Sequence, residues 1–206
     1  MHITFGRKSR LVTLGAGLLS AAALAISASG PALADTADTG GTGSLIVPIA
    51  VVVGAANANI VMLPGTPATS SFDPTAGTDT VTFPVTGGNG EVGNFSGTVH
   101  YGGSLVFINS KTGTSVTVTN IQLNFFNGAV TGQFPGGTKQ TALAYIRGVM
   151  SSSSDPGPPA TETFTTDEVD LSLKAATALN TALGTKVFRR GTDIGGFTTT
   201  FDVTVS

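Results

Sequence analysis

The segment SVTVTNIQLNFFNGAVTGQF, residues 115–134, decides the fold class of this chain. Residues 115–119 alternate between valine and a hydroxyl side chain, which places the valines on one face of a β-strand. Residues 121–126 and 129–134 flank Asn127-Gly128, and Asn-Gly between two apolar runs is the strongest short-range signal for a β-hairpin. The segment therefore predicts antiparallel β-structure.

Similar strand-like segments lie on both sides of this hairpin. We expect a second, glycine-linked hairpin from residues 97–101 and 104–108. The remaining strands are expected at residues 80–85, 141–150, 168–173 and 197–205. Many short strands separated by glycine turns are typical of an antiparallel sandwich or barrel.

Three segments depart from this pattern. Residues 45–63 are predicted to form two buried strands joined by a bend at residues 54–59, with a short helix at the start of the segment as the alternative. Residues 174–183 are rich in Ala and Leu and end at Gly184, which predicts a short α-helix. Residues 151–160, SSSSDPGPPA, are predicted to be a low-complexity loop.

The first 34 residues are typical of a secretory signal peptide. Three basic residues precede an apolar run from Leu11 to Ser29, and the small residues Ala32 and Ala34 occupy the positions that a signal peptidase reads. A transmembrane anchor is the alternative, because about 20 apolar residues can span a bilayer. The Ala-x-Ala pattern favours cleavage after Ala34, with no transmembrane span remaining.

The chain beyond Ala34 is expected to be a flexible linker over residues 35–44 followed by a single domain over residues 45–206. This part has seven basic and twelve acidic residues, a net charge of −5. Such a balance argues against nucleic acid as a partner, since phosphate binding needs clustered Lys and Arg. The absence of cysteine excludes disulfides and thiolate metal sites.

Few residues in the chain beyond Ala34 have the chemistry that catalysis needs. His100 is the only histidine there, and no nucleophile-elbow pattern occurs. The acidic cluster of Asp167, Glu168 and Asp170 predicts a solvated strand edge, with calcium binding as the alternative. The pair at residues 189–190 is two arginines, which are expected to be solvated but are able to hold an anionic group. We therefore expect no catalytic residue and no metal site.

Two segments, residues 95–134 and 169–203, resemble HtaA-like domains of secreted and cell-surface proteins in Gram-positive actinobacteria. In that family a Gly-x-Val/Ile-x-His stretch leads into a glycine turn, and a small Ala/Leu helix precedes the last strand. The resemblance implies a mainly β fold, an antiparallel immunoglobulin-like β-sandwich with one short α-helix near the C-terminus. It also implies haem as a ligand, because the best-known members bind haem through a tyrosine with a supporting histidine. His100 and Tyr101 are the residues that the resemblance puts forward for that role.

Together these features predict a secreted, non-catalytic protein, either free or associated with the cell wall. It is expected to act in the bacterial cell envelope by binding or assembly, with an envelope or extracellular ligand or a second copy of itself as partner. No cofactor is expected in this interpretation. A haem-binding module of the HtaA type is the first alternative, and a secreted hydrolase is the second.

Overall fold

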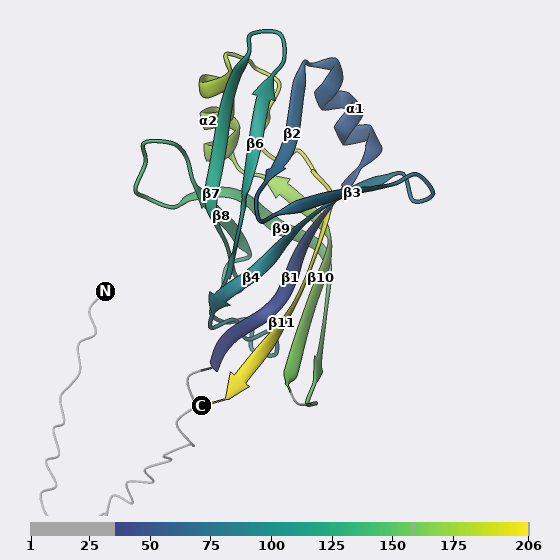
Figure 1. Ribbon diagram of the computed structural model, residues 1–206, viewed down its shortest axis with the longest axis vertical. Coiled ribbons are helices and arrows are strands. Elements are labelled where there is room, and N and C mark those ends of the chain that lie inside the picture. Colours follow the sequence, from purple (N-terminus) through teal and green to yellow (C-terminus); the bar gives the residue numbers. More distant parts are fainter. Residues whose placement is uncertain (1–35, 158, 206) are drawn as a thin grey trace, which may run out of the picture. The chain divides into compact units, whose positions relative to one another are not determined.

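The computed structural model describes residues 36–157 and 159–205, which form eleven strands and two helices (Figure 1). The predicted signal peptide, with Ala32 and Ala34, lies outside the described residues. The strands are β1 (Thr36–Pro48), β2 (Ile60–Gly65), β3 (Thr69–Asp73), β4 (Thr78–Gly88), β5 (Thr98–Tyr101), β6 (Ser104–Asn109), β7 (Thr114–Asn124), β8 (Ala129–Gln133), β9 (Thr141–Asp155), β10 (Ala160–Leu171) and β11 (Gly196–Val205). The helices are α1 (Ile49–Asn57) and α2 (Leu173–Leu183), and neither of these described helices is long and apolar enough to cross a membrane.

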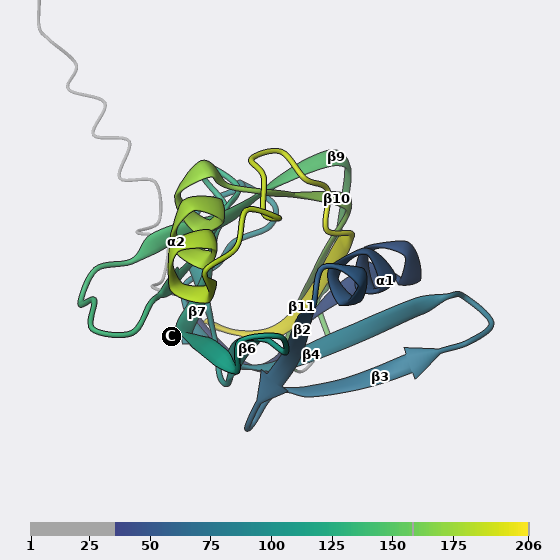
Figure 2. The same cartoon turned by 90° about the horizontal axis from the view of Figure 1, so that it is seen from above.

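The strands form a closed antiparallel ring. Strand β7 pairs with β5 and β6 along one edge and with β8 along the other, so eight strands close in the order β7, β5, β4, β1, β11, β10, β9, β8. Strands β2 and β6 extend the ladder of β7 beyond the ring, and β3 pairs with β4 outside it. Figure 2 shows the ring from above. The predicted mainly β, antiparallel fold is confirmed, but an immunoglobulin-like sandwich of two separate sheets does not form.

Closure depends on irregularities that the alternating sequence pattern does not reveal. The register shifts between Thr119 and Gln122 in the β7–β8 pair and between Val130 and Thr131 in the β8–β9 pair. Similar shifts occur in the β1–β11, β4–β5 and β9–β10 pairs. A bulge bends its strand and increases the local twist, which lets a sheet curve until its edges meet.

Residues 36–44, predicted to be a flexible linker, are part of strand β1. This strand lies between β4 and β11 and makes a ladder with both. The glycines of this strand led to the prediction of a flexible linker, but in the structure they allow close approach of the neighbouring strands. Gly41 has φ +90°, and an added Cβ would overlap the carbonyl oxygen of Thr200.

The apolar segment of residues 45–63 forms the end of β1, helix α1 and strand β2. The predicted first strand is therefore wrong at residues 49–53, the predicted bend is wrong at residues 54–57, and the alternative of a short helix is confirmed. Pro48 precedes the helix with φ −59°, and the Ile49 N–H donates to the Gly77 carbonyl at 2.8 Å. None of the α1 side chains is buried, so the helix lies against the ring on one side only.

Two other predictions also changed in the folded chain. Residues 98–101 and 104–109 do not pair with each other as a hairpin, because β5 and β6 pair with successive parts of β7. Residues 151–155, predicted to be part of a loop, extend β9 and pair with β10. In both cases the hydrogen-bond partners belong to a longer strand, β7 in the first case and β10 in the second, and the local sequence does not reveal this pairing.

The hairpin at Asn127-Gly128 and the short helix are confirmed. Helix α2 begins after Ser172, whose hydroxyl accepts from the Ala175 N–H at 3.0 Å, and ends at Gly184 in the left-handed conformation with φ 63°. Its residues Leu179 and Leu183 are buried, as their spacing predicts. Inside the ring, six buried aromatic side chains form the core: Phe83, Tyr101, Phe125, Phe164, Phe197 and Phe201.

Replacing Gly41 by Ala tests whether the N-terminal segment is an integral strand. We expect the Gly41→Ala variant to lose about 1 to 3 kcal/mol of unfolding free energy, because the strained φ and the contact with Thr200 both disfavour a Cβ. The control is Gly54→Ala in α1, where no atom lies within 4 Å of an added Cβ. That variant should gain about 0.5 to 1 kcal/mol from helix propensity. Urea unfolding measures both, and an unchanged Gly41→Ala midpoint would favour a mobile linker.

Candidate functional site

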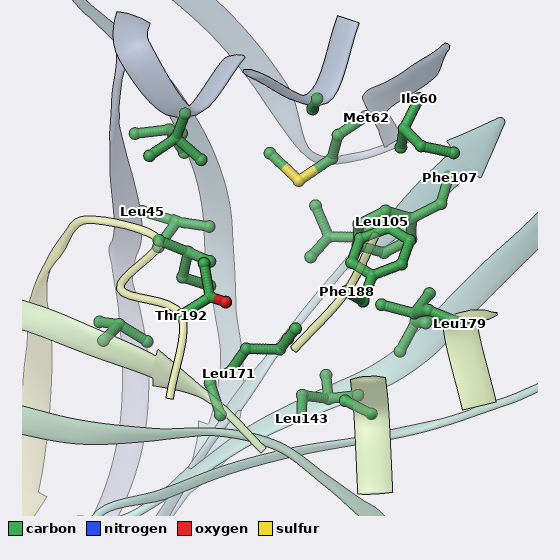
Figure 3. Close-up of a pocket in the computed structure, with 18 of the residues that line it drawn as sticks. Leu45, Ile60, Met62, Leu105, Phe107, Leu143, Leu171, Leu179, Phe188 and Thr192 are labelled. Atoms are coloured by element: carbon green, nitrogen blue, oxygen red, sulfur yellow. The ribbon is translucent and has the colours of Figure 1, made fainter. Parts of the chain in front are cut away.

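The ring contains a cavity of about 440 Å³ at the end covered by the two helices. Helix α1, strands β2 and β6, helix α2 and the loop after α2 all contribute to its wall (Figure 3). The side chains labelled in Figure 3 are mostly aliphatic or aromatic: Leu45, Ile60, Met62, Leu105, Phe107, Leu143, Leu171, Leu179, Phe188 and Thr192. The site is thus a concave, apolar chamber.

Strand alternation supplies one wall of the cavity. In β2, Met62 points into the cavity, whereas its neighbour Leu63 is 45% exposed and takes no part in the lining (Figure 3). Successive side chains of a strand point to opposite faces, which explains the contrast between Met62 and Leu63, while Val61 also reaches the lining. In β6, Leu105 and Phe107 line the same cavity for the same reason.

The loop after α2 supplies a further part of the wall, and one amide side chain holds it in place. The Asn180 Nδ2 donates to the Phe188 carbonyl at 2.9 Å, and the Phe188 N–H donates to the Asn180 Oδ1 at 3.1 Å. The Phe188 ring then meets Phe107 edge-to-face, with ring centroids 6.0 Å apart. This wall is therefore built before any ligand arrives.

The few polar groups in the lining are largely engaged with the protein itself. The Tyr101 hydroxyl donates to Thr199 Oγ1 at 3.0 Å, and the Thr192 hydroxyl donates to the Arg189 carbonyl at 3.0 Å. Burial raises the pKa of Tyr101 well above its usual value, so the phenol stays neutral at physiological pH. Asp79 is the only carboxylate in the lining, and among the described lining residues no Lys, Arg or His occurs.

The structure does not bring His100 and Tyr101 together. They are consecutive in β5, so His100 is exposed on the outer face while Tyr101 is buried and lines the cavity. The backbone of His100 lies between Gly87 of β4 and Gln122 of β7, away from the cavity wall. These two residues cannot act on one ligand from this arrangement.

The other charged residues singled out in the sequence lie outside the cavity. Within the described part of the chain, no three His, Cys, Asp or Glu side chains are grouped to hold a metal. Asp167 accepts from the Val149 N–H at 2.8 Å, where β9 and β10 shift register. Arg189 and Arg190 are exposed, in the loop that supplies Phe188.

A pair of carboxyl groups lies near the opposite ends of the same strands. Asp38 Oδ2 accepts from the Gly90 N–H at 2.7 Å, and Glu162 accepts from the Val92 N–H. The turn between β4 and β5 is thereby drawn into this end of the ring, where Val92 is fully buried. Asp38 Oδ1 is buried and has no hydrogen-bond partner among the described residues.

This arrangement disfavours the charged form of Asp38. Burial, opposed by the Gly90 hydrogen bond and assisted by the nearby Glu162, raises the pKa of Asp38 from 3.8 to about 6. The carboxyl pair does not line the cavity. We therefore assign it a role in closing the ring rather than in ligand binding.

The sequence prediction missed the cavity altogether. The residues of its lining come from segments far apart in the chain, and each segment by itself has the pattern of a hydrophobic core. The sequence contained one signal, the long apolar stretch of residues 45–63, which is interrupted by a glycine and two asparagines. In the structure, helix α1 within this stretch has no fully buried side chain. The apolar side chains of α1 that pack against the core, Val51, Val52 and Ala55, are also part of the cavity lining.

Comparison with solved structures now identifies the fold. The C-terminal domain of HtaA from Corynebacterium glutamicum matches with a TM-score of 0.54 over 81% of this chain and 100% of that domain, at 15% sequence identity. The chain has the HtaA fold. The haem-binding protein HtaB from the same organism matches with a TM-score of 0.51 over 82% of this chain and 96% of that protein, at 14% identity.

The resemblance to HtaA-like domains expected from the sequence is confirmed at the level of the HtaA fold. Protein-family models and curated protein sequences gave no match to the chain. Identities of 14 and 15% carry information on architecture, and a site must be argued from the residues present. The cavity at the helical end of this HtaA-type ring is the strongest such site.

The raised pKa of Asp38 predicts a pH-dependent stability. Because the folded pKa lies above the unfolded value of 3.8, the stabilising contribution is fully present below pH 3.8 and is lost as the pH rises through about 6. An Asp38→Asn variant keeps an acceptor for Gly90 and removes the charge, so it should exceed the wild type by roughly 1 to 3 kcal/mol at pH 7.5 and by little at pH 4.

Chemical denaturation across that pH range measures the difference between the two proteins. Asp38→Ala is the matched control, because it removes both the charge and the acceptor for the Gly90 N–H. That variant should be less stable than Asp38→Asn at every pH. Parallel pH profiles of the wild type and Asp38→Asn would contradict the assignment.

Proposed function

We propose that this domain binds an apolar small molecule in the cavity. The observation that carries the proposal is the chamber of about 440 Å³ with an almost entirely hydrocarbon wall. Small-molecule sites are concave and lined mainly by hydrophobic and aromatic side chains, as this chamber is. Its volume falls within the range of about 300 to 1,000 Å³ that is typical of small-molecule sites.

The proposed binding is driven by burial of apolar surface. Each Å² of apolar ligand surface removed from water contributes about 25 cal/mol, and the aromatic and aliphatic wall offers van der Waals contacts to the ligand. The amide clamp between Asn180 and Phe188 pre-organises one wall, which lowers the entropy cost of binding. The ligand therefore needs no strong polar contact inside the chamber.

We propose binding without catalysis, in a secreted protein of the cell envelope. The ionisable groups of the lining are Asp79 and Tyr101. Burial keeps the Tyr101 phenol neutral, and its hydroxyl donates a hydrogen bond to Thr199. General acid–base chemistry needs a group whose pKa lies near the working pH and that reaches the substrate. The envelope location rests on the leader sequence of residues 1–34.

Haem is the second candidate, supported by the likeness to the haem-binding protein HtaB. The residues present do not fit ligation by a tyrosine with a supporting histidine, because His100 faces outward and the Tyr101 hydroxyl is engaged by Thr199. The soft donor that the lining does offer is the Met62 thioether (Figure 3). Haem is thus favoured by the fold and disfavoured by the donor set.

Filling the cavity tests the main proposal. A Met62→Trp substitution places an indole in the chamber, so binding of the neutral fluorophore N-phenylnaphthylamine should weaken at least about tenfold, which corresponds to roughly 1.4 kcal/mol. The matched control is Leu63→Trp, which adds the same group to the outer face of β2 and should bind like the wild type. Fluorescence titration measures both. A wild-type protein that does not bind the probe, or equal loss in both variants, would refute the cavity as the site.

Haem titration tests the second candidate separately. If haem is the ligand, a saturable change in its Soret band should appear with the wild type and disappear with Met62→Trp. His100→Ala should leave the band unchanged, because His100 lies outside the cavity. Absence of any Soret change removes haem while the proposal for an apolar ligand still rests on the fluorophore.

A further inference from the structure

The loop between α2 and β11 combines two kinds of side chain. Residues Val187, Phe188, Thr192 and Ile194 of this loop line the cavity. Between and beside them stand three exposed basic residues: Lys186, Arg189 and Arg190. These three are nearly half of the seven basic residues beyond residue 34, in an otherwise acidic chain. We name residues 186, 189 and 190 the basic rim.

The backbone directly after the basic rim is fixed by hydrogen bonds to β10, and Phe188 within the same loop is held by Asn180. The Gly191 N–H donates to the Leu171 carbonyl at 2.8 Å, and the Leu171 N–H donates to the Thr192 carbonyl at 2.9 Å. The Ile194 N–H donates to the Val169 carbonyl at 2.9 Å. The basic rim therefore stands on an ordered loop at the cavity wall, and not on a free surface tail.

We infer that the ligand is an amphiphile with an anionic head group, a carboxylate or a phosphate, that meets the basic rim while its apolar part fills the cavity. This inference rests on the function proposed above. Burying an anion among hydrocarbon side chains is costly, and the lining offers it no cation. A head group held at the basic rim stays hydrated and gains charge-assisted hydrogen bonds from arginine.

The acidic groups around the cavity are consistent with this placement. Asp79 lies in the lining on β4, so an anionic head would be repelled from that part of the wall. Asp193, in the same loop as the basic rim, has its carboxylate engaged by the Gly195 N–H at 2.8 Å. The charge distribution thus favours an anion beside residues 186–190 and disfavours one near β4.

Displacement of N-phenylnaphthylamine by ligands that share one chain and differ in the head group tests the inference. The competitors are hexadecanoic acid, hexadecyl phosphate, hexadecanol and hexadecylamine, each below its micelle concentration. We expect both anions to bind more tightly than the alcohol and the amine. The two anions distinguish a carboxylate from a phosphate head. The preference for anions should shrink as salt is raised, since exposed charges are screened.

Removing the basic rim tests the residues themselves. A triple variant, Lys186→Gln, Arg189→Gln and Arg190→Gln, should weaken binding of the preferred anion roughly fivefold to tenfold, the effect expected of a few solvent-exposed ion pairs. Its affinity for hexadecanol should stay unchanged. This pattern separates the basic rim from a general loss of folding, which would weaken all four competitors together.

A second triple variant controls for net charge. Lys111→Gln, Lys139→Gln and Arg147→Gln remove the same charge from positions that neither line the cavity nor adjoin a lining residue in the chain, and they should keep the wild-type preference for anions. Equal binding of acid and alcohol by the wild type overturns the inference but leaves the cavity function intact. Failure of every competitor and of the fluorophore overturns the proposed function itself.

Discussion

The pairing of β7 with β5 on one edge and β8 on the other is the constraint on which the rest of the structure depends. It closes eight strands into a ring, and the interior of an eight-stranded ring is just wide enough to be filled by side chains or to hold one small ligand. This chain combines a filled interior with an open space. Aromatic side chains fill the middle of the ring, and the end beneath the helices keeps an open, apolar chamber.

The two ends of the ring are finished in different ways. At one end, Asp38 and Glu162 accept backbone N–H groups from the turn between β4 and β5, at the cost of a buried carboxyl group with a raised pKa. At the other end, α1, α2 and the loop after α2 lie against the ring without filling it. Polar groups thus close one end of the ring, whereas the wall of the chamber at the other end is almost entirely hydrocarbon.

Much of the strand and helix content was predictable, because it depends on local patterns. The Asn127-Gly128 hairpin, the α2 helix with its Gly184 stop and the final strand followed from spacing and residue type alone. The errors occurred where the conformation of a residue is set by contacts with residues far away in the chain. Gly41 was predicted to lie in a linker, because the sequence does not show that its backbone packs against Thr200. Strands β5 and β6 were predicted to pair with each other, whereas both pair with the longer strand β7.

The candidate site was less predictable than the fold. His100 and Tyr101 are adjacent in the chain, yet strand alternation places the His100 side chain on the outer face and the Tyr101 side chain in the core. Neighbouring positions in the sequence therefore have side chains on opposite faces of the sheet. By itself, the sequence determined the antiparallel β character, the short helix and the acidic balance of the chain, since composition and period are local properties. Only the tertiary structure decided that the sheet closes, that a chamber remains and that residues 186–190 stand beside it. Those outcomes depend on register and bulges, which are set by the packing of segments far apart in the chain.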